Sequence, residues 1–217
     1  MKKTNILLAV IVLLSFAVSL YVYPQAPDEL ASHWNASGEV DGYMEKIWGL
    51  FLMPIVGVAM LLLFLVIPRI DPLKRNIEEF RKYYDGFIII MMLFLFYIHL
   101  LTILWNLDVV FNMTQAIAPA FGILFFYCGI LIENSKRNWF IGIRTPWTLM
   151  DDEIWRKTHD LGGKLFKATG IIAFAGVLVP DYAIYFMLFP VLIASVYTLV
   201  YSYVEYNKKY KKRKSQG

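Results

Sequence analysis

Long runs of apolar residues alternate with shorter polar segments along the whole chain. A helix that crosses a bilayer needs about 20 apolar residues, and six runs reach or approach that length. The six predicted spans are Asn5–Tyr21, Ile47–Ile67, Phe87–Leu107, Met113–Ile132, Leu165–Val179 and Tyr182–Val204. The fifth run is short, and we expect its span to begin earlier in the chain. The pattern predicts an all-α, polytopic membrane protein built as a six-helix transmembrane bundle.

The composition of the chain is that of a membrane protein. Hydrophobic residues make up 59% of the 217 residues and charged residues 18%, below the roughly 25% that is usual in soluble domains. The first run follows two lysines, so it also fits a signal peptide. We expect it to remain as a span, because no small-x-small cleavage site follows it and it is long for a signal core. Cys128 is the single cysteine, which excludes an internal disulfide.

The basic residues are distributed unevenly between the connections. Of the 21 lysines and arginines, only Lys46 lies in an odd-numbered connection; the others lie near the chain ends, in Pro68–Gly86 or in Glu133–Lys167. Because basic loops stay on the cytoplasmic side, both termini are predicted to be cytoplasmic, with Tyr23–Lys46 outside the cell membrane. The net charge of +4 then reflects orientation and contact with membrane lipids. The chain contains no nucleic-acid-binding motif, and we expect no nucleic-acid partner.

The predicted spans contain almost no ionisable groups. No Asp, Glu, Lys or Arg lies near the middle of a span, which argues against a proton pump, a charge-coupled transporter or a voltage sensor. The one ionisable side chain at depth is His99, with Thr102 on the same helical face. It is either a proton relay or a neutral histidine that is hydrogen-bonded within the bundle. Gly170, Ala173 and Gly176 give the fifth span a small face for close helix packing.

A polar segment, Asn138–Lys164, separates the fourth and fifth apolar runs. Thr148 and Asp151 form a Thr-x-x-Asp sequence close to a capping box, and Gly162-Gly163 supplies a stop. These signals predict a short helix at about Leu149–Leu161. Because one of its faces is apolar, we expect an amphipathic helix along the membrane interface between spans four and five. The alternative is that it closes the bundle from below.

An arginine, a proline and a tryptophan stand just before this predicted helix. Pro146 biases Thr145 toward an extended conformation. Arg144 suits a forked pair with a lipid phosphate or a carboxylate, with Trp147 as an anchor at the interface. The alternative is a plain aromatic anchor beside an arginine that reaches the headgroups.

The first connection groups polar side chains with turn residues. His33, Trp34, Asn35 and Asp41 precede Gly42, which predicts a compact loop. The five acids of this connection suit a cationic peptide; the alternative is a folded lid whose polar side chains cap backbone groups. A histidine and an aspartate supply only two metal ligands, so no metal site is predicted.

Two stretches resemble the SdpI family of bacterial multi-span immunity proteins. The family pattern is Asn-x-x-x-Gly-Ile-Arg-Thr-Pro-Trp-Thr-Leu, an acidic turn, Val/Ile-Trp-x-x-Thr-His and Gly-Gly. It is matched by Asn138, Gly142, Ile143, Arg144, Thr145, Pro146, Trp147, Thr148, Leu149, Ile154, Trp155, Thr158, His159, Gly162 and Gly163. A small membrane module of unknown function often precedes this family, and its pattern is matched by Pro27, Asp28, His33, Trp34, Asn35, Gly38, Asp41 and Gly42.

The resemblance implies a division of the chain and a function. Residues 1–67 are expected to form a two-span module with the extracellular loop, and residues 68–217 a four-span region with the cytoplasmic loop and a basic tail. The family implies a non-catalytic protein that gives immunity to a secreted antimicrobial peptide. In the founding case it also implies sequestering a transcriptional repressor at the membrane.

This hypothesis assigns binding residues to each side of the membrane. Outside, a peptide toxin would meet the loop residues His33, Trp34, Asn35, Gly38, Asp41 and Gly42. Inside, a repressor would meet the segment that contains Asn138, Arg144, Thr145, Pro146, Trp147, Thr148, Trp155 and His159.

A competing hypothesis is a transporter or enzyme that acts on a lipid or small molecule. For this the spans offer only four polar side chains, namely His99, Thr102, Asn106 and Thr114. The sequence has no HExxH, GxSxG or paired intramembrane aspartates, so we predict no catalytic residue and no cofactor.

Overall fold

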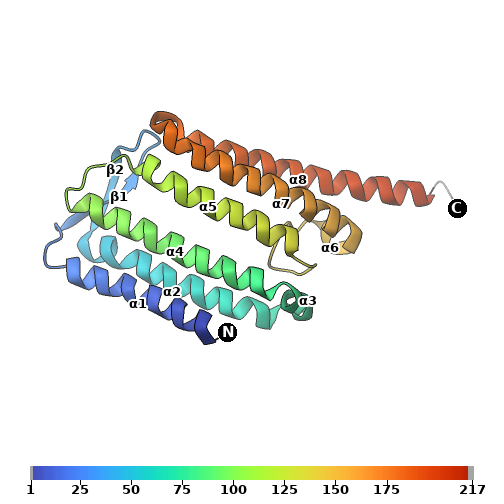
Figure 1. Ribbon diagram of the computed structural model, residues 1–217, viewed down its shortest axis with the longest axis horizontal. Coiled ribbons are helices and arrows are strands. Elements are labelled where there is room, and N and C mark those ends of the chain that lie inside the picture. The colour runs from blue at the N-terminus through green and yellow to red at the C-terminus, as the bar shows by residue number, and fades with distance from the viewer. Residues whose placement is uncertain (1, 215–217) are drawn as a thin grey trace.

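The computed structural model describes the backbone of residues 2–214 and the side chains of residues 4–211. The side chains of Lys2, Lys3 and the basic residues at positions 212–214 lie outside that description. Within it there are six long helices, and each runs antiparallel to the next one along the chain (Figure 1). They are α1 (Lys2–Val22), α2 (Lys46–Ile70), α4 (Arg81–Asn106), α5 (Met113–Asn134), α7 (Asp152–Ala175) and α8 (Ala183–Lys214).

Each long helix matches one of the six predicted spans and is long and apolar enough to cross a membrane. Their outer faces carry exposed large apolar side chains, such as Leu13, Leu62 and Ile193. Such surfaces are a liability in water but are what a bilayer requires. The predicted fold, an all-α polytopic membrane bundle, is therefore confirmed.

Short elements connect the long helices and distinguish the two ends of the bundle. They are β1 (Glu29–Trp34), β2 (Val40–Glu45), α3 (Lys74–Glu79), α6 (Pro146–Met150) and the 3₁₀ turns η1 (Gly176–Leu178) and η2 (Pro180–Tyr182). One end carries the β-hairpin and the α4–α5 and α7–α8 connections; we call it the hairpin end. The opposite end carries both chain ends, α3 and α6 (Figure 1); we call it the termini end.

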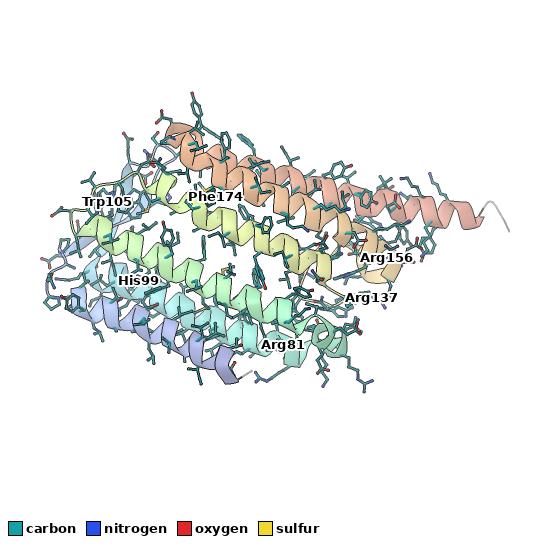
Figure 2. The ribbon with its side chains drawn as sticks, in the orientation of Figure 1. Arg81, His99, Trp105, Arg137, Arg156 and Phe174 are labelled. Atoms are coloured by element: carbon teal, nitrogen blue, oxygen red, sulfur yellow. The ribbon has the colours of Figure 1, made fainter. Side chains whose placement is uncertain are left out.

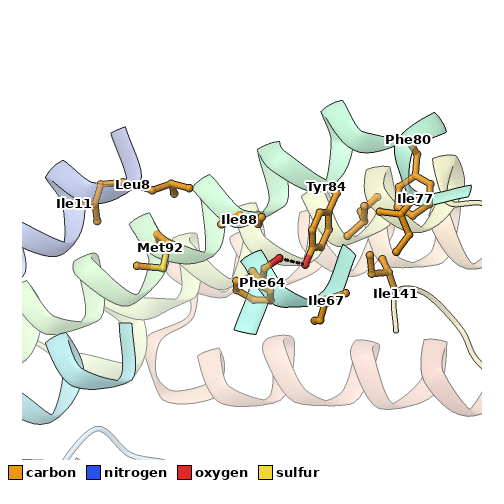
Figure 3. Close-up of a cluster of buried hydrophobic side chains, with 11 residues drawn as sticks. Leu8, Ile11, Phe64, Ile67, Ile77, Phe80, Tyr84, Ile88, Met92 and Ile141 are labelled. Atoms are coloured by element: carbon orange, nitrogen blue, oxygen red, sulfur yellow. Dashed lines mark hydrogen bonds between the residues drawn. The ribbon is translucent and has the colours of Figure 1, made fainter. Parts of the chain in front are cut away.

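The six helices form two groups of three. The first group contains α1, α2 and α4, and the second contains α5, α7 and α8, with α4 packing on α5 between them (Figure 1). The largest buried cluster belongs mainly to the first group (Figure 3). Tyr84 lies within it and donates a hydrogen bond of 2.9 Å to the carbonyl oxygen of Phe64, which satisfies its hydroxyl in an apolar setting.

The second group is held by glycines that face each other across α5 and α7. A Cβ atom at Gly170 would lie 2.5 Å from the carbonyl oxygen of Gly122, and one at Gly129 would lie 2.6 Å from that of Gly163. The two backbones therefore touch, which is how helices associate in lipid without a hydrophobic driving force. The small face predicted for the fifth span lies in this contact through Gly170.

The predicted bounds of the short helix, Leu149–Leu161, are wrong, because these residues are divided between α6 and the first part of α7. A short helix, α6, does lie between spans four and five, and its place at the membrane interface stays a prediction. α7 continues through Gly162-Gly163. These glycines make room for packing, because a Cβ at Gly163 would lie 2.6 Å from the Cβ of Glu133. The fifth span begins earlier than its apolar run, as expected. Lys167 in α7 pairs with Glu133 near the end of α5, at 2.7 Å. The charged turns of α7 that precede Lys167 therefore extend beyond the end of α5.

The first connection, predicted as a compact loop, is a two-stranded antiparallel hairpin. Leu30 and Ala31 are buried beneath it, and Leu30 belongs to a small cluster with Val22, Leu50 and Ile103. The two strands could not be predicted from the sequence pattern. Each is only six residues long, and the inward side chains of the hairpin pack on helices elsewhere in the chain.

Candidate functional sites at the two ends of the bundle

The hairpin turn is organised by Asn35 and Gly38. The Asn35 side-chain oxygen accepts hydrogen bonds from the backbone N–H groups of Ser37 and Glu39, at 2.9 and 3.0 Å. Gly38 has φ +81°, a conformation that favours glycine. Both residues predicted to bind a ligand therefore also shape the turn.

His33 and Asp41 face each other on the exposed surface of the hairpin. Nδ1 of His33 and Oδ1 of Asp41 are joined by a hydrogen bond of 2.5 Å. Gly42 lies opposite His33 in the ladder, and a Cβ at Gly42 would lie 3.0 Å from the Cβ of His33. The glycine thus makes room for the histidine.

The hairpin is fixed to the bundle through α4. The backbone N–H of Ala31 donates to Oδ1 of Asn106 at 2.8 Å, and Nδ2 of Asn106 donates back to the Ala31 carbonyl at 3.0 Å. The rings of Trp34 and Trp105 meet edge to face, 5.7 Å apart. These contacts anchor the strand that carries His33 to the end of a long helix.

The hairpin end carries a strongly acidic surface. Its charged side chains are seven exposed carboxylates, Asp28, Glu29, Glu39, Asp41, Glu45, Asp108 and Asp181, and one lysine, Lys46. The sequence interpretation considered only the acids of the first connection. Asp108 and Asp181 were missed, although both lie in odd-numbered connections that lack basic residues. The fold adds their charges to the same end.

A chamber of about 640 Å³ lies under the hairpin, between the two groups of helices. The hairpin contributes residues 32–36, the first group contributes side chains of α2 and α4, and the second contributes side chains of α5 and α8. Its lining is mainly apolar. Trp34 and Thr102 are both among the lining residues, so the structure brings one predicted intramembrane residue close to the predicted outer loop.

At the termini end, the segment between α5 and α6 folds around Asn138. This side chain is fully buried. Its oxygen accepts from the N–H groups of Phe140 and Ile141, and its nitrogen donates to the carbonyls of Lys136 and Ile141, at 2.6–2.9 Å. All four hydrogen-bonding positions of the amide are used, so Asn138 holds the loop and has nothing left for a partner.

His159 is the second centre of this segment. It is 1% exposed. Its Nε2 accepts from the N–H of Ile143 at 2.9 Å, so Nδ1 carries the proton and donates to the Trp155 carbonyl at 2.8 Å. The Trp155 ring stacks on it at 3.9 Å, and the Trp155 indole donates to the Ser135 carbonyl at 3.0 Å. Both predicted binding residues are built into the scaffold.

Gly142 permits this packing. Its φ is +106°, and a Cβ there would lie 2.5 Å from Nε2 of His159. Only a glycine lets the chain pass so close to the ring. The glycine of the Gly-Ile-Arg-Thr motif is thus explained by a contact 17 positions further along the chain.

The threonines of the motif cap α6. Thr145 is its N-cap, and Thr145 and Thr148 form a reciprocal capping box. Thr148 also donates to the Ile143 carbonyl at 2.8 Å, and the hydroxyls of Thr145 and Ser202 lie 3.0 Å apart. The cap is therefore Thr145, and Asp151 caps the next helix, α7, instead of serving as the acid of a Thr148 capping box.

Three of the predicted residues at this end remain accessible to a partner. Arg144 and Pro146 are exposed and Trp147 is half-buried. Arg144 donates to the Trp139 carbonyl at 2.8 Å, and the Trp147 ring lies 5.0 Å from that of Tyr203. The motif thus separates into a buried framework and a small exposed surface.

Two residues of the second connection, which the sequence interpretation did not include in the site, bind this segment to the first group. Asp71 is buried; its carboxylate accepts from the N–H of Leu73 at 2.6 Å and from that of Trp139 at 2.8 Å. Asn76 donates to the Arg137 carbonyl at 2.7 Å. Asp71 is the C-cap residue of α2, and nothing in the local sequence indicated that its side chain would reach across 68 positions.

An ionic network joins the start of α7 to the end of α8. Asp151 caps α7 and pairs with Lys209 at 2.8 Å, and Lys157 pairs with Glu205 at 3.1 Å. Burial raises the pKa of Asp151, but hydrogen bonds from Lys209, the Ile154 N–H, Tyr210 and the Glu153 N–H outweigh it and lower the pKa to about 2. The acidic turn therefore also holds the basic tail.

A polar cavity of about 850 Å³ lies beside this network. Cationic and anionic side chains line it together, among them Lys82, Lys136, Arg137, Glu79 and Asp160. Figure 2 shows Arg137 and Arg156 at this end, opposite Trp105. Such a mixed lining suits a polar protein surface better than a single small ion.

His99 is buried between α1 and α4, and its Nε2 lies 3.0 Å from Oγ of Ser19. The Ser19 hydroxyl also contacts the Leu50 carbonyl at 2.7 Å. Thr102 donates to the carbonyl of Ile98 in its own helix. His99 and Thr102 thus have different hydrogen-bond partners, and the serine contact favours the structural interpretation of His99.

The comparisons with known proteins agree with the two resemblances seen in the sequence. Residues 134–202 match the model of the SdpI/YfhL protein family, and residues 10–58 match a domain of unknown function, DUF1648. The chain is 28% identical over 207 residues to the Immunity protein SdpI of Bacillus subtilis (strain 168), covering 95% of this chain and 97% of that protein. No solved structure matches the chain. The chain thus has six helices that are long and apolar enough to cross a membrane, and it is similar to SdpI/YfhL proteins in its second half and to DUF1648 in its first.

Proposed function

We propose that this protein is a non-catalytic immunity protein of the cell membrane that protects against a secreted antimicrobial peptide. The observation that carries the proposal is the similarity to the Immunity protein SdpI along 95% of the chain. The aligned part of the chain includes both ends of the bundle.

The proposed orientation places both termini in the cytoplasm and the hairpin outside. The basic residues beside the helices of the termini end and the acidic surface of the hairpin end support it, because basic loops stay in the cytoplasm. A peptide would then meet the hairpin with His33, Trp34, Asn35 and Asp41.

A signalling role at the termini end is the finer part of the proposal. A transcriptional repressor would dock on the exposed Arg144 and Pro146, the half-buried Trp147 and the neighbouring polar cavity. Asn138, Thr145, Thr148, Trp155 and His159 would support this surface from inside. We further propose that residues 1–67 and 68–217 act as the receiving module and the responding region.

A test of immunity compares bacteria that produce the chain with bacteria that produce an unrelated six-span protein at the same level. Both are exposed to the secreted peptide toxin against which the SdpI family protects. We expect the lethal concentration to rise at least about tenfold, which corresponds to about 1.4 kcal/mol in an equilibrium. Equal killing of the two cultures would refute the proposed function.

The orientation has its own test. In a Cys128→Ser background, single cysteines at Ser37 and at Arg144, both exposed, are labelled in intact cells with a membrane-impermeant thiol reagent. We expect labelling of the Ser37→Cys variant in intact cells and of the Arg144→Cys variant only after lysis. Labelling of both in intact cells would exclude the proposed arrangement.

A further inference from the structure

We propose that the chamber under the hairpin binds the apolar segment of a cationic peptide, with the acidic surface around it holding the peptide's positive charges. This inference rests on the proposed immunity function and adds the place and chemistry of peptide binding to it.

The first argument is the shape and lining of the chamber. It has a volume of about 640 Å³ and separates the two groups of helices. Its lining includes Trp48, Leu52, Met53, Ile98, Ile117 and Phe121. It extends along α4 from the hairpin to Phe94, which lies twelve residues before the end of the helix, or about 18 Å at the helical rise. An elongated apolar occupant fits such a space, and methionine side chains adapt to its shape.

The second argument is the charge around the chamber. The described charged side chains of the hairpin end are seven carboxylates and one lysine. Glu29 and Glu45 even lie directly opposite each other in the hairpin ladder, where like charges destabilise a sheet. Folding therefore gives no reason for this pair. An acidic surface attracts a cationic peptide and repels an anionic lipid headgroup, so the charge selects the peptide as the occupant.

The two arguments act together. The apolar lining gives the middle of a peptide a place to bind, and the carboxylates around it attract positive charges at the ends of that segment. An uncharged apolar occupant would gain nothing from this charge, so the combination of lining and charge favours a cationic peptide.

Binding can be measured with purified full-length protein in uncharged phosphatidylcholine nanodiscs. The probe is a synthetic peptide whose apolar segment is short enough for a space of about 640 Å³ and is flanked by lysines. The matched peptide carries glutamates in place of the lysines. We expect the lysine peptide to bind at least about tenfold more tightly, and added salt to reduce this difference because it screens exposed charges.

Matched substitutions locate the binding site. Ile98→Trp fills the chamber and should weaken binding at least about tenfold. Leu104→Trp, on the same helix at an exposed position outside the lining, should leave affinity unchanged. If Ile98→Trp is not recovered folded, Ile117→Trp fills the chamber from the opposite wall.

One further variant tests the charge. The double change Glu29→Gln and Glu45→Gln should weaken binding of the lysine peptide about three- to tenfold while the melting temperature stays level or rises. The same double change should leave the affinity for an uncharged apolar peptide unaltered.

The outcomes distinguish this inference from the proposed function. Equal affinity for the two peptides, or an unchanged affinity in both chamber-filling variants, would overturn the inference. So would a tightly bound phospholipid that is lost on filling the chamber while peptide affinity stays the same. Immunity that survives in the chamber-filling variants would also overturn it, while leaving the proposed function intact. A failure of the unchanged protein to protect cells concerns the proposed function alone.

Discussion

A histidine stands in the motif at each end of the bundle, and the surroundings of the two differ in every respect. His33 is exposed and pairs with Asp41 on the same hairpin. His159 is 1% exposed, and both of its ring nitrogens are bonded to backbone groups. The asparagines repeat the contrast, because Asn35 shapes a surface turn whereas Asn138 is fully buried.

This comparison separates two uses of motif residues. At the termini end, the hydrogen-bonding groups of Asn138 and His159 are all used within the protein, so the fold requires these two residues and a partner can meet only their exposed neighbours. At the hairpin end, the polar side chains are held in place but keep one side open to solvent. Substitutions at the two ends should therefore fail for different reasons.

The largest contrast is expected between the two glycines with positive φ. Gly142→Ala forces an alanine into φ +106° and places its Cβ 2.5 Å from His159, so we expect a loss of about 3–5 kcal/mol or no folded protein. Gly38→Ala meets only the side chain of Asn112 and should cost about 1–2 kcal/mol. Thermal unfolding in detergent measures both losses. Equal melting temperatures of the two variants would contradict the expected difference between the two glycines.

The two asparagines give the next largest difference. Asn138→Ala leaves buried backbone groups without partners and should cost about 2–4 kcal/mol. Asn35→Ala exposes its turn to water, which replaces the lost bonds, and should cost about 1 kcal/mol. The midpoints of chemical unfolding provide the measurement. A larger loss at Asn35 would show that the hairpin is more integral to the fold than its exposure indicates.

The acid dependence of stability should depend on Asp151. Because its pKa falls from 3.8 to about 2 on folding, its contribution is complete above pH 4 and is lost as the pH falls toward 2. The contribution is at most about 2 kcal/mol, and less after solvent screening of Lys209. Asp151→Asn should flatten the melting-temperature profile between pH 4 and pH 2, and Lys209→Met should do the same. A profile unchanged by either variant would show that the network carries no stability.

The smallest effect is expected at the exposed arginine. Arg144→Ala removes one hydrogen bond to a surface carbonyl, so the free energy of unfolding should change by less than about 0.5 kcal/mol. Any partner that docks at the termini end should nevertheless bind more weakly in a pull-down from membranes. A large loss of stability would place Arg144 with the buried framework instead of the exposed surface.

The spans were predictable because each one is indicated by a local feature of the sequence, an apolar run long enough to cross a bilayer. Residue types also predicted a compact first connection, although not its two strands. The continuity of α7 was not predicted, because Gly162-Gly163 looks like a helix stop until Glu133 and Ile143 are seen against it. Local propensity favoured an end there, and packing between distant segments overruled it.

The roles of the predicted binding residues depended still more on distant contacts. His159 receives the N–H of Ile143, Thr145 meets Ser202, and Asp71 receives the N–H of Trp139. None of these pairs is adjacent in sequence, so the pattern identified the important residues without separating framework from surface. The resemblance to a family marked them together for the same reason.

The division of charge between the two ends has an electrical consequence. A cell holds the inner side of its membrane negative, and moving one elementary charge through 100 mV changes its free energy by about 2.3 kcal/mol. The hairpin end carries seven carboxylates and one lysine, whereas lysines and arginines outnumber the acids in the rest of the chain, so the chain is a fixed dipole in that field. Inverting it would carry both sets of charges against the voltage, so the energised state of the cell itself favours one direction of insertion.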